Sequence, residues 1–420
     1  MTSMTDMTGQ ADAAGRTGTA GIAGKVDAWG AHPAQFWLRG RAPEAPVAFD
    51  PQAGIWCVYG YEEVQHVLAN PATYSSNTQR VVPQEMLEGA DQFREGNLIQ
   101  MDALEHKKLR GLISHAFNPK VVADLEPRIA ELTHELLDAL PAGNRMELVE
   151  DLAYPLPVIV IAELLGVPSS DRDKFRQWGT ALLEATQEFS FTDPSDEQRR
   201  QLQDAMQQVA KLADYMREHV LDRRKNPRDD LITKLVQAEV DGEHLTDNEV
   251  VNFSHILLIA GHITTTMLLG NSILCLDSHP EWFARVRADR SLVPAAIEES
   301  LRYLSPFAGT ARATTTDVEL GGQHIPADSI LVTFLGVANR SPKHFPDPDV
   351  FDPSRDPNPH MAFGRGAHFC IGAPLARLEG KVALDILLDR YPHLRTDPDR
   401  PPRFLPSLSM TGVRELPLVF

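Results

Sequence analysis

The stretch that decides the fold is Phe363-Gly364-Arg365-Gly366-Ala367-His368-Phe369-Cys370-Ile371-Gly372. It places three glycines around one cysteine, and an amphipathic helix is predicted directly after it, over residues 374–388. Glycines let a backbone approach another group closely, and amides near a helix N-terminus favour a thiolate, which suits a metal ion. The alternatives are an inert buried cysteine and a zinc site with His360 and His368. Zinc is disfavoured because no second cysteine lies nearby and a structural zinc ion takes four ligands.

Every fixed position of this stretch matches the motif Phe-Gly-x-Gly-x-His-x-Cys-x-Gly, and the chain resembles the cytochrome P-450 superfamily of haem-thiolate monooxygenases, soluble bacterial type. The resemblance implies a mainly α fold with small β-sheets, a single large haem domain in which a long central helix lies over the haem. It also implies that Cys370 is the thiolate ligand of the iron in haem b. Phe363, Gly364 and Gly372 are then cofactor-binding positions around that cysteine.

A second motif, Glu-x-x-Arg, occurs at residues 299–302, where the spacing lets both side chains pair on one helix face. Another copy at residues 197–200 is interpreted as a solvated surface pair. In the family an arginine of the proline-rich segment joins the pair, and Arg355 stands at that point. The resemblance therefore assigns Glu299, Arg302 and Arg355 a structural role, holding residues 342–359 to the core.

A third motif provides cations. His106 and Arg110 are spaced i, i+4 on one face of a predicted helix, an arrangement that suits two carboxylates. By the resemblance this pair binds the haem propionates, and matching positions add Arg312 and His368. The alternative for each residue is a solvated basic surface.

The fourth motif, residues 260–266, lies in a stretch without charged residues that predicts a long buried helix. By the resemblance it is the oxygen-activating segment, with Ala260 and Gly261 beside the cofactor and Thr264 and Thr265 catalytic. A Thr264 hydroxyl bonded back to the Ala260 carbonyl would loosen the helix.

One position of this segment departs from the family. Ile263 stands where the family usually has a carboxylate that relays protons during oxygen activation. Three interpretations stay open: water held by Thr264 and Thr265 serves the relay, a substrate hydroxyl assists, or the chemistry is not ordinary hydroxylation. His262 is a poor substitute because it lies about a hundred degrees away on the helix.

The resemblance places a hydrophobic substrate against an apolar surface on the far side of the haem from the cysteine. The predicted lining residues are Phe253, Ile256, Leu257, Ile263, Phe307 and Ala308. The predicted function is insertion of one oxygen atom from O2 by hydroxylation or epoxidation, tailoring a secondary metabolite such as a polyketide or macrolide. The alternatives are a haem-thiolate sensor or carrier, and a non-hydroxylating oxidative enzyme.

Composition limits partners and location. Forty Lys and Arg against 58 Asp and Glu give a net charge of −18, which disfavours nucleic acid and anionic membranes. Three scattered cysteines and an N-terminus without a signal-peptide pattern predict a cytoplasmic protein. Residues 1–24 read as a disordered tail and residues 25–420 as one domain.

The electron source is predicted to be external, because the chain has neither a dinucleotide-binding glycine motif nor cluster-type cysteine spacing. We expect ferredoxin and ferredoxin reductase as donors. A basic face is the expected ferredoxin dock. Its residues are Lys107, Lys108, Arg110, Lys120, Arg365, Arg377 and Lys381.

The coarse secondary-structure prediction is helix-rich. Helices are expected over residues 104–117, 120–140, 198–223 and 247–277, and strands over residues 55–59, 313–320, 330–334 and 416–420. Six prolines between residues 342 and 359 predict an extended segment.

Overall fold

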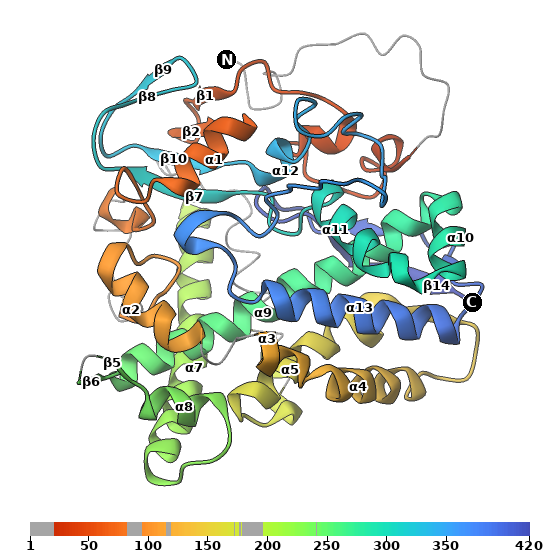
Figure 1. The fold of residues 1–420 in the computed structure, drawn as a ribbon, viewed down its shortest axis with the longest axis horizontal. Helices are drawn as coiled ribbons and strands as arrows, with labels where there is room; N and C mark the ends of the chain where they lie inside the picture. Colours follow the sequence, from red (N-terminus) through yellow and green to blue (C-terminus); the bar gives the residue numbers. More distant parts are fainter. Residues whose placement is uncertain are drawn as a thin grey trace.

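The computed structural model describes residues 21–81, 95–114, 119–171, 173–175, 178, 196–240 and 242–420. Helices make up most of it, and the labelled strands of the largest sheet, β1, β2, β7 and β10, gather at one side (Figure 1), so the predicted mainly α fold with small β-sheets is confirmed. Residues 1–20 of the predicted tail lie outside the described residues. Within residues 21–24, Ile22–Gly24 forms a short 3-10 helix and Ile22 is buried. The division at residue 25 stays a prediction.

The helices follow one another along the whole chain. They are α1 (Tyr61–Ala69), α2 (Ala103–Ser114), α3 (Pro119–Ala123), α4 (Glu126–Asp138), α5 (Pro155–Leu165), α7 (Asp196–Lys225), α8 (Leu231–Gln237), α9 (Asp247–Asp277), α10 (Pro280–Ala288), α11 (Val293–Tyr303), α12 (Leu335–Ala338) and α13 (Ala373–Arg390). Shorter 3-10 turns are η1 (Ile22–Gly24), η2 (Phe36–Arg39), η3 (Thr78–Val81), η7 (Ser169–Asp171), η8 (Arg290–Leu292) and η9 (Gly366–His368), and η6 (Val149–Ala153) is a π-helix.

The strands form small sheets. They are β1 (Val47–Asp50), β2 (Ile55–Val58), β3 (Tyr74–Ser75), β4 (Arg145–Glu147), β5 (Glu239–Val240), β6 (Glu243–His244), β7 (Thr310–Thr314), β8 (Val318–Leu320), β9 (Gln323–Ile325), β10 (Ile330–Thr333), β11 (Arg395–Thr396), β12 (Arg403–Phe404), β13 (Val413–Glu415) and β14 (Pro417–Val419). The largest sheet has the order β1-β2-β10-β7-β3, with β10 parallel to β2. Arg312 stands in β7 opposite Leu331 of β10.

Helix α9 is the central element, and its bounds match the predicted helix. A capping box starts it: the Thr246 hydroxyl accepts from the Glu249 amide, and the Glu249 carboxylate accepts from the Thr246 amide. It packs against α5, α7, α11 and α13. By length and composition α9 could cross a membrane, but 72% of its apolar window is buried inside the protein, as expected of a core helix.

Two predicted elements are divided in the structure. The helix expected over residues 120–140 is broken into α3 and α4, because Pro127 stands in the first turn of α4 and lacks the amide that a continuous helix needs. The strand expected over residues 313–320 is broken where the Thr315 amide donates to the Thr73 carbonyl. β7 therefore joins the large sheet, whereas β8 pairs with β9.

A buried ion pair holds the proline-rich segment to α11. Both side chains of Glu299 and Arg302 are 0% exposed, with Arg302 Nε 2.8 Å from Glu299 Oε2 and Arg302 Nη2 2.7 Å from Glu299 Oε1. Arg302 also donates to the carbonyls of Asn339, Pro348 and Val350. Arg355 Nε lies 3.5 Å from Glu299 Oε2, so the three predicted residues lie together. The carbonyls of Pro348 and Val350 belong to the proline-rich segment that leads to Cys370, and that of Asn339 belongs to the C-cap of α12.

We expect Arg302→Ala to lower the free energy of unfolding by about 3–5 kcal/mol, because it leaves the buried Glu299 carboxylate without its partner. The midpoint of denaturant unfolding measures the loss. Arg200→Ala, at an exposed position of α7, is the matched control and should change stability little. Equal stability of Arg302→Ala and the parent would contradict the structural role.

Candidate functional site

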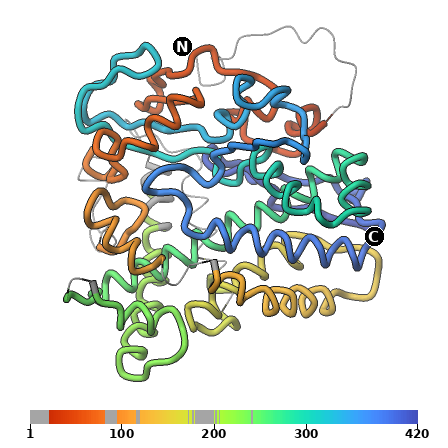
Figure 2. The backbone as a smooth tube through the Cα atoms, viewed as in Figure 1, coloured from red at the N-terminus to blue at the C-terminus, as the bar shows by residue number. Residues whose placement is uncertain are grey.

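The cysteine loop is a tight turn fixed by its own backbone and by α1. The Cys370 amide donates to the Phe363 carbonyl at 2.9 Å. Gly364 has φ +69° and Gly366 φ +70°, a region that favours glycine. A Cβ on Gly366 would lie 2.4 Å from the Leu68 carbonyl oxygen, so the loop packs directly on the end of α1. Figure 2 shows the path of the backbone, in which the late part of the chain returns beside its early part.

The Cys370 sulfur lies over the N-terminus of α13. Burial raises the pKa of the thiol, whereas hydrogen bonds from the Gly372 and Ala373 amides and the charges of Arg110 and Arg377 act in the opposite direction. Among the described residues, no group of three or more His, Cys, Asp or Glu side chains could hold a metal ion. A metal at Cys370 would therefore have to bring other ligands with it.

The four residues predicted to bind the propionates lie together near this loop. His106 and His368 have ring centroids 4.1 Å apart, and Arg110 donates to the Phe369 carbonyl. Arg312 lies close enough to lower the pKa of both histidines. His106, Arg312 and the Cys370 loop thus come from α2, β7 and the segment before α13, which are distant in sequence.

Electrostatics make this cluster short of negative charge. Burial and neighbouring cations lower the pKa of His106, and they lower that of His368 to about 3. The carboxylate that acts against these shifts is Asp102, which already accepts from the Ser75 hydroxyl and the Ser76 amide. His106 Nε2 is buried without a hydrogen-bond partner among the described residues. A ligand with two carboxylates fits this cluster.

The middle of α9 has open space beside it, although most of the helix is buried. Ala260 is exposed and Ile256, Ile263 and Thr264 are partly exposed, at positions that form one stripe of the helix. Phe307 and Phe369 are also exposed, at 39% and 40%. These residues and the cation cluster fit a large apolar group with acidic side arms, such as haem.

Three successive hydroxyls on α9 bond back to the helix. Thr264 donates to the Ala260 carbonyl at 2.8 Å, which confirms the predicted bond, and Thr265 donates to the Gly261 carbonyl at 3.0 Å. Gly261 itself faces α5, where a Cβ would lie 2.9 Å from Ile161 Cγ1. Its place beside the cofactor stays a prediction. Ile263 leaves the segment without a carboxylate.

The predicted substrate residues divide into two groups. Ile256, Ile263 and Phe307 keep exposed surface, whereas Phe253, Leu257 and Ala308 are buried at 2%, 6% and 0% exposure. The second group packs against other side chains of the main core. That all six residues contact the substrate stays a prediction.

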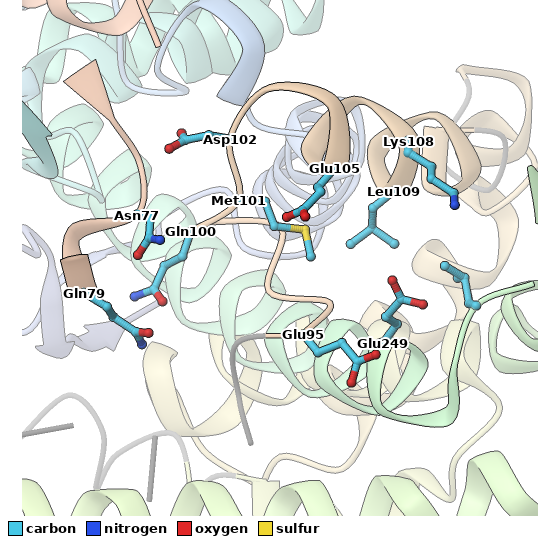
Figure 3. Close-up of a pocket in the computed structure, with 11 residues that line it drawn as sticks. Asn77, Gln79, Glu95, Gln100, Met101, Asp102, Glu105, Lys108, Leu109 and Glu249 are labelled. Carbon is cyan, nitrogen blue, oxygen red and sulfur yellow. The ribbon is translucent and has the colours of Figure 1, made fainter. Parts of the chain in front are cut away.

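A pocket of about 950 Å³ lies elsewhere, between the segment before α2, α2 itself and the start of α9 (Figure 3). None of the predicted substrate residues lines it. Its lining residues are Asn77, Gln79, Glu95, Gln100, Met101, Asp102, Glu105, Lys108, Leu109, Leu245 and Glu249. Asp102 connects this polar space to the cation cluster.

Sequence reasoning missed a clamp on the cysteine loop. Arg377 donates to both Glu298 oxygens at 2.6 and 2.9 Å, and its guanidinium lies 4.5 Å from the Phe363 ring centroid. His360 Nε2 lies 3.0 Å from Glu298 Oε2. Burial alone raises the pKa of Glu298, but these hydrogen bonds overcome it and bring the pKa to about 2. The partners are 62 and 79 residues apart in sequence, so spacing gave no signal.

The predicted basic docking face is partly neutralised. Lys108 pairs with Glu243, and Lys381 lies 3.4 Å from Glu126 and 3.5 Å from Asp385. Arg377 is held by Glu298. The face therefore offers fewer free cations than the sequence indicates.

Comparisons with known proteins agree on one family. The family model described as Cytochrome P450 matches residues 49–418. The cyclomarin C epoxidase CymV of Salinispora arenicola is 41% identical over 91% of this chain and 95% of its own length. The erythromycin C-12 hydroxylase of Saccharopolyspora erythraea is 43% identical over 86% of this chain and 88% of its own.

A solved structure gives the same result. The post-tailoring hydroxylase HmtN, involved in himastatin biosynthesis, superposes with a TM-score of 0.82 at 51% identity, covering 94% of this chain and 98% of that one. Both sequence and fold thus relate this chain to the same group of oxygenases.

Gly366→Ala should lower the free energy of unfolding by about 1–2 kcal/mol from the left-handed backbone alone, with a further loss from the clash with Leu68. Denaturant unfolding measures it. Gly111→Ala in α2 is the control: nothing lies within 4 Å of its would-be Cβ, so helix propensity predicts a gain of about 0.5–1 kcal/mol. If Gly366→Ala were as stable as the parent, the contact between the loop and α1 would not constrain the site.

Proposed function

Because the chain belongs to the cytochrome P450 family and is a monooxygenase of the haem-thiolate type, we propose that Cys370 ligates the iron of haem b. The observation that carries this proposal is the cluster of His106, Arg110, Arg312 and His368, which is short of negative charge and lies near the cysteine loop. Two propionates would supply the missing charge. Phe363, Gly364 and Gly372 would shape the loop around the sulfur.

The bound haem supplies the chemistry of O2 reduction and oxygen transfer, in which thiolate donation favours O–O cleavage. The protein's part is to hold and to orient. The Gly372 and Ala373 amides stabilise negative charge on the Cys370 sulfur. The Arg377 guanidinium, stacked on Phe363 and fixed by Glu298, keeps the loop in place. The exposed stripe of α9 leaves room for substrate beside Ala260.

Proton delivery is assigned to α9. The Thr264 hydroxyl donates its hydrogen to the Ala260 carbonyl, so the hydroxyl oxygen can accept a hydrogen bond from water. With Ile263 in place of an acid, Thr264 and Thr265 would organise water rather than a carboxylate. Two other interpretations remain: a substrate hydroxyl assists proton delivery, or the oxidative chemistry is not ordinary hydroxylation.

The proposed substrate is a hydrophobic secondary metabolite such as a polyketide or macrolide, modified by hydroxylation or epoxidation. The named relatives support this class, since they include an epoxidase acting on cyclomarin C and a hydroxylase of erythromycin. The proposed pocket contacts are Phe253, Ile256, Leu257, Ile263, Phe307 and Ala308.

The proposed partners are a ferredoxin and its reductase, in the cytoplasm. The absence of a dinucleotide-binding glycine motif in the sequence supports an external electron donor. Lys107 is exposed on α2 and supports a docking face there.

The purified protein tests the proposed function. We expect product that depends on reductant and O2 from a library of hydrophobic metabolites, together with a red-shifted spectrum of the reduced protein with carbon monoxide. Cys370→Ala should abolish that spectrum because it removes the thiolate. A wild-type spectrum in the variant would contradict the ligand assignment. Ligand-induced spectral shifts without O2 uptake would instead favour a sensor or carrier.

Thr264→Ala should leave haem content and substrate binding unchanged but lower the product formed per reductant consumed, by a factor on the order of ten, and raise hydrogen peroxide release. The reason is that alanine lacks the hydroxyl oxygen that would accept a hydrogen bond from water beside Ala260. Ser272→Ala is the control, because Ser272 makes the same kind of bond to the Leu268 carbonyl two turns further along α9. Parental coupling in Thr264→Ala would remove this threonine from the relay.

A further inference from the structure

Two consecutive glutamates of α11 make different contacts. Glu299 holds the proline-rich segment through Arg302, whereas Glu298 reaches across to α13, which packs against α11 (Figure 1). Glu298 Oε1 lies 2.6 Å from Arg377 Nε, and Glu298 Oε2 lies 2.9 Å from Arg377 Nη2. Two parallel hydrogen bonds of this kind fix a guanidinium in direction as well as in distance. The orientation of Arg377 is therefore set by α11.

A third contact fixes the Glu298 carboxylate. The Ala362 amide donates to His360 Nδ1 at 3.2 Å, so this ring nitrogen is the acceptor and His360 Nε2 carries the proton. His360 Nε2 lies 3.0 Å from Glu298 Oε2 and donates to it. Burial acts to raise the pKa of Glu298, but the hydrogen bonds bring it to about 2, so the carboxylate is charged at neutral pH. A negative and a positive charge are thus held in one fixed pair.

The positive member of this pair lies beside the cysteine loop. The Arg377 guanidinium carbon lies 4.5 Å from the centroid of the Phe363 ring, and the Phe363 carbonyl accepts the Cys370 amide at 2.9 Å. Arg377 stands in the second turn of α13, which begins three residues after Cys370. Burial raises the pKa of the Cys370 thiol, and the charge of Arg377 acts in the opposite direction. Arg377 is thus the member of the pair that acts on the sulfur.

Two guanidinium groups act on the Cys370 sulfur, and they differ in what compensates them. Arg110 belongs to the cluster proposed to bind the propionates, so its negative partner would come with the cofactor. Arg377 is paired with a carboxylate of the chain itself, that of Glu298. The field of Arg377 at the sulfur is therefore reduced by a charge that a single substitution removes.

We propose that Glu298 sets the reduction potential of the haem iron by compensating the charge of Arg377 beside the Cys370 sulfur. Glu298 and Arg377 are positioning residues in this proposal, because both act through the sulfur. The inference rests on the proposed function, since it requires haem ligated by Cys370. It goes beyond holding the loop in place, because it gives the clamp a share in how strongly the thiolate donates to the iron.

The direction of the effect follows from the electron balance. One electron from the external donor converts ferric to ferrous iron, the donor is oxidised, and no bond breaks. The reduced site carries one more negative charge, so a nearby positive charge favours the reduced form and a nearby negative charge favours the oxidised form. Arg377 therefore raises the potential, and Glu298 lowers it.

Potentiometric titration of the haem-loaded protein with small soluble mediators tests the proposal, because it needs neither ferredoxin nor turnover. Glu298→Gln keeps the size of the side chain but removes its charge, and should raise the potential. Arg377→Gln should lower it. We expect each substitution to change the reduction equilibrium by a factor on the order of ten, which is about 59 mV for a one-electron couple.

The opposite signs distinguish this role from a structural one. Both substitutions break the same ion pair, so a merely loosened loop would move the potential in the same direction in both variants. The double variant Glu298→Gln/Arg377→Gln should lie between the two single variants. Arg377→Lys keeps the charge but loses the paired geometry, and should lie closer to the parent than to Arg377→Gln. Shifts of the same sign in the two single variants, or no shift, would overturn the proposal.

A second measurement serves for any variant whose reduction is not reversible. The infrared stretching frequency of carbon monoxide on the reduced iron falls as the thiolate donates more electron density. It should rise in Glu298→Gln and fall in Arg377→Gln. The side chains of Glu298 and Arg377 are 32% and 38% exposed, so high salt should reduce both shifts. Equal frequencies in both variants and the parent would count against the proposal.

Arg390→Gln is the matched control, because Arg390 lies on the same helix and pairs with Asp138 at 2.6 Å. It is the last residue of α13, about 20 Å along the helix from Arg377, and its substitution should leave potential and frequency unchanged. If even the parent lacked the red-shifted spectrum with carbon monoxide, the proposed function would fail. If parent and variants all showed that spectrum at equal potentials, the inference alone would fail, so the two failures are distinguishable.

Discussion

The buried pair of Glu299 and Arg302 is the interaction on which the arrangement of the site depends. A charge pair with 0% exposure is stable only if its remaining hydrogen-bonding positions are filled, and here the backbone of the proline-rich segment fills them. The segment contains too many prolines to form regular structure of its own. The ion pair and the segment therefore order each other, and the cysteine loop that follows is delivered to the N-terminus of α13 in one position.

Two of the buried sites with unsatisfied polar groups have opposite character. Beside the cysteine loop, His106 Nε2 has no hydrogen-bond partner among the described residues, and on α13 neither carboxyl oxygen of the buried Glu379 has one. A protein of this size could have filled both with apolar side chains at less cost to stability. The first deficit fits the acidic side arms of the proposed haem. The fold thus reserves polar space for species that the chain does not itself supply.

Much of this was readable in the sequence because the informative spacings are local. The ten residues before α13, the pair at i, i+3 in α11 and the limits of α9 all follow from short motifs and periodicity. Contacts across the fold were not readable: Arg377 with Glu298, Gly366 with Leu68, and Gly261 with Ile161 join elements with no sequence relation. Glu379 looks like an ordinary helix glutamate, because only the packing of neighbouring helices makes it buried. Pro127 indicated the break before α4, but the apolar periodicity of residues 120–140 favoured one continuous helix.

The internal pairing of Lys108, Arg377 and Lys381 has a consequence for encounters with an acidic redox protein. At low ionic strength, where the Debye length is long, the net charge of −18 repels such a protein before contact. Close to the cysteine loop, Lys108, Arg377 and Lys381 are already engaged by acids of the same chain, so these three cations add little attraction on approach. Electrostatic steering would therefore contribute weakly, and association would be slower than between oppositely charged proteins. An encounter of that kind depends more on the shape of the two surfaces than on their charge.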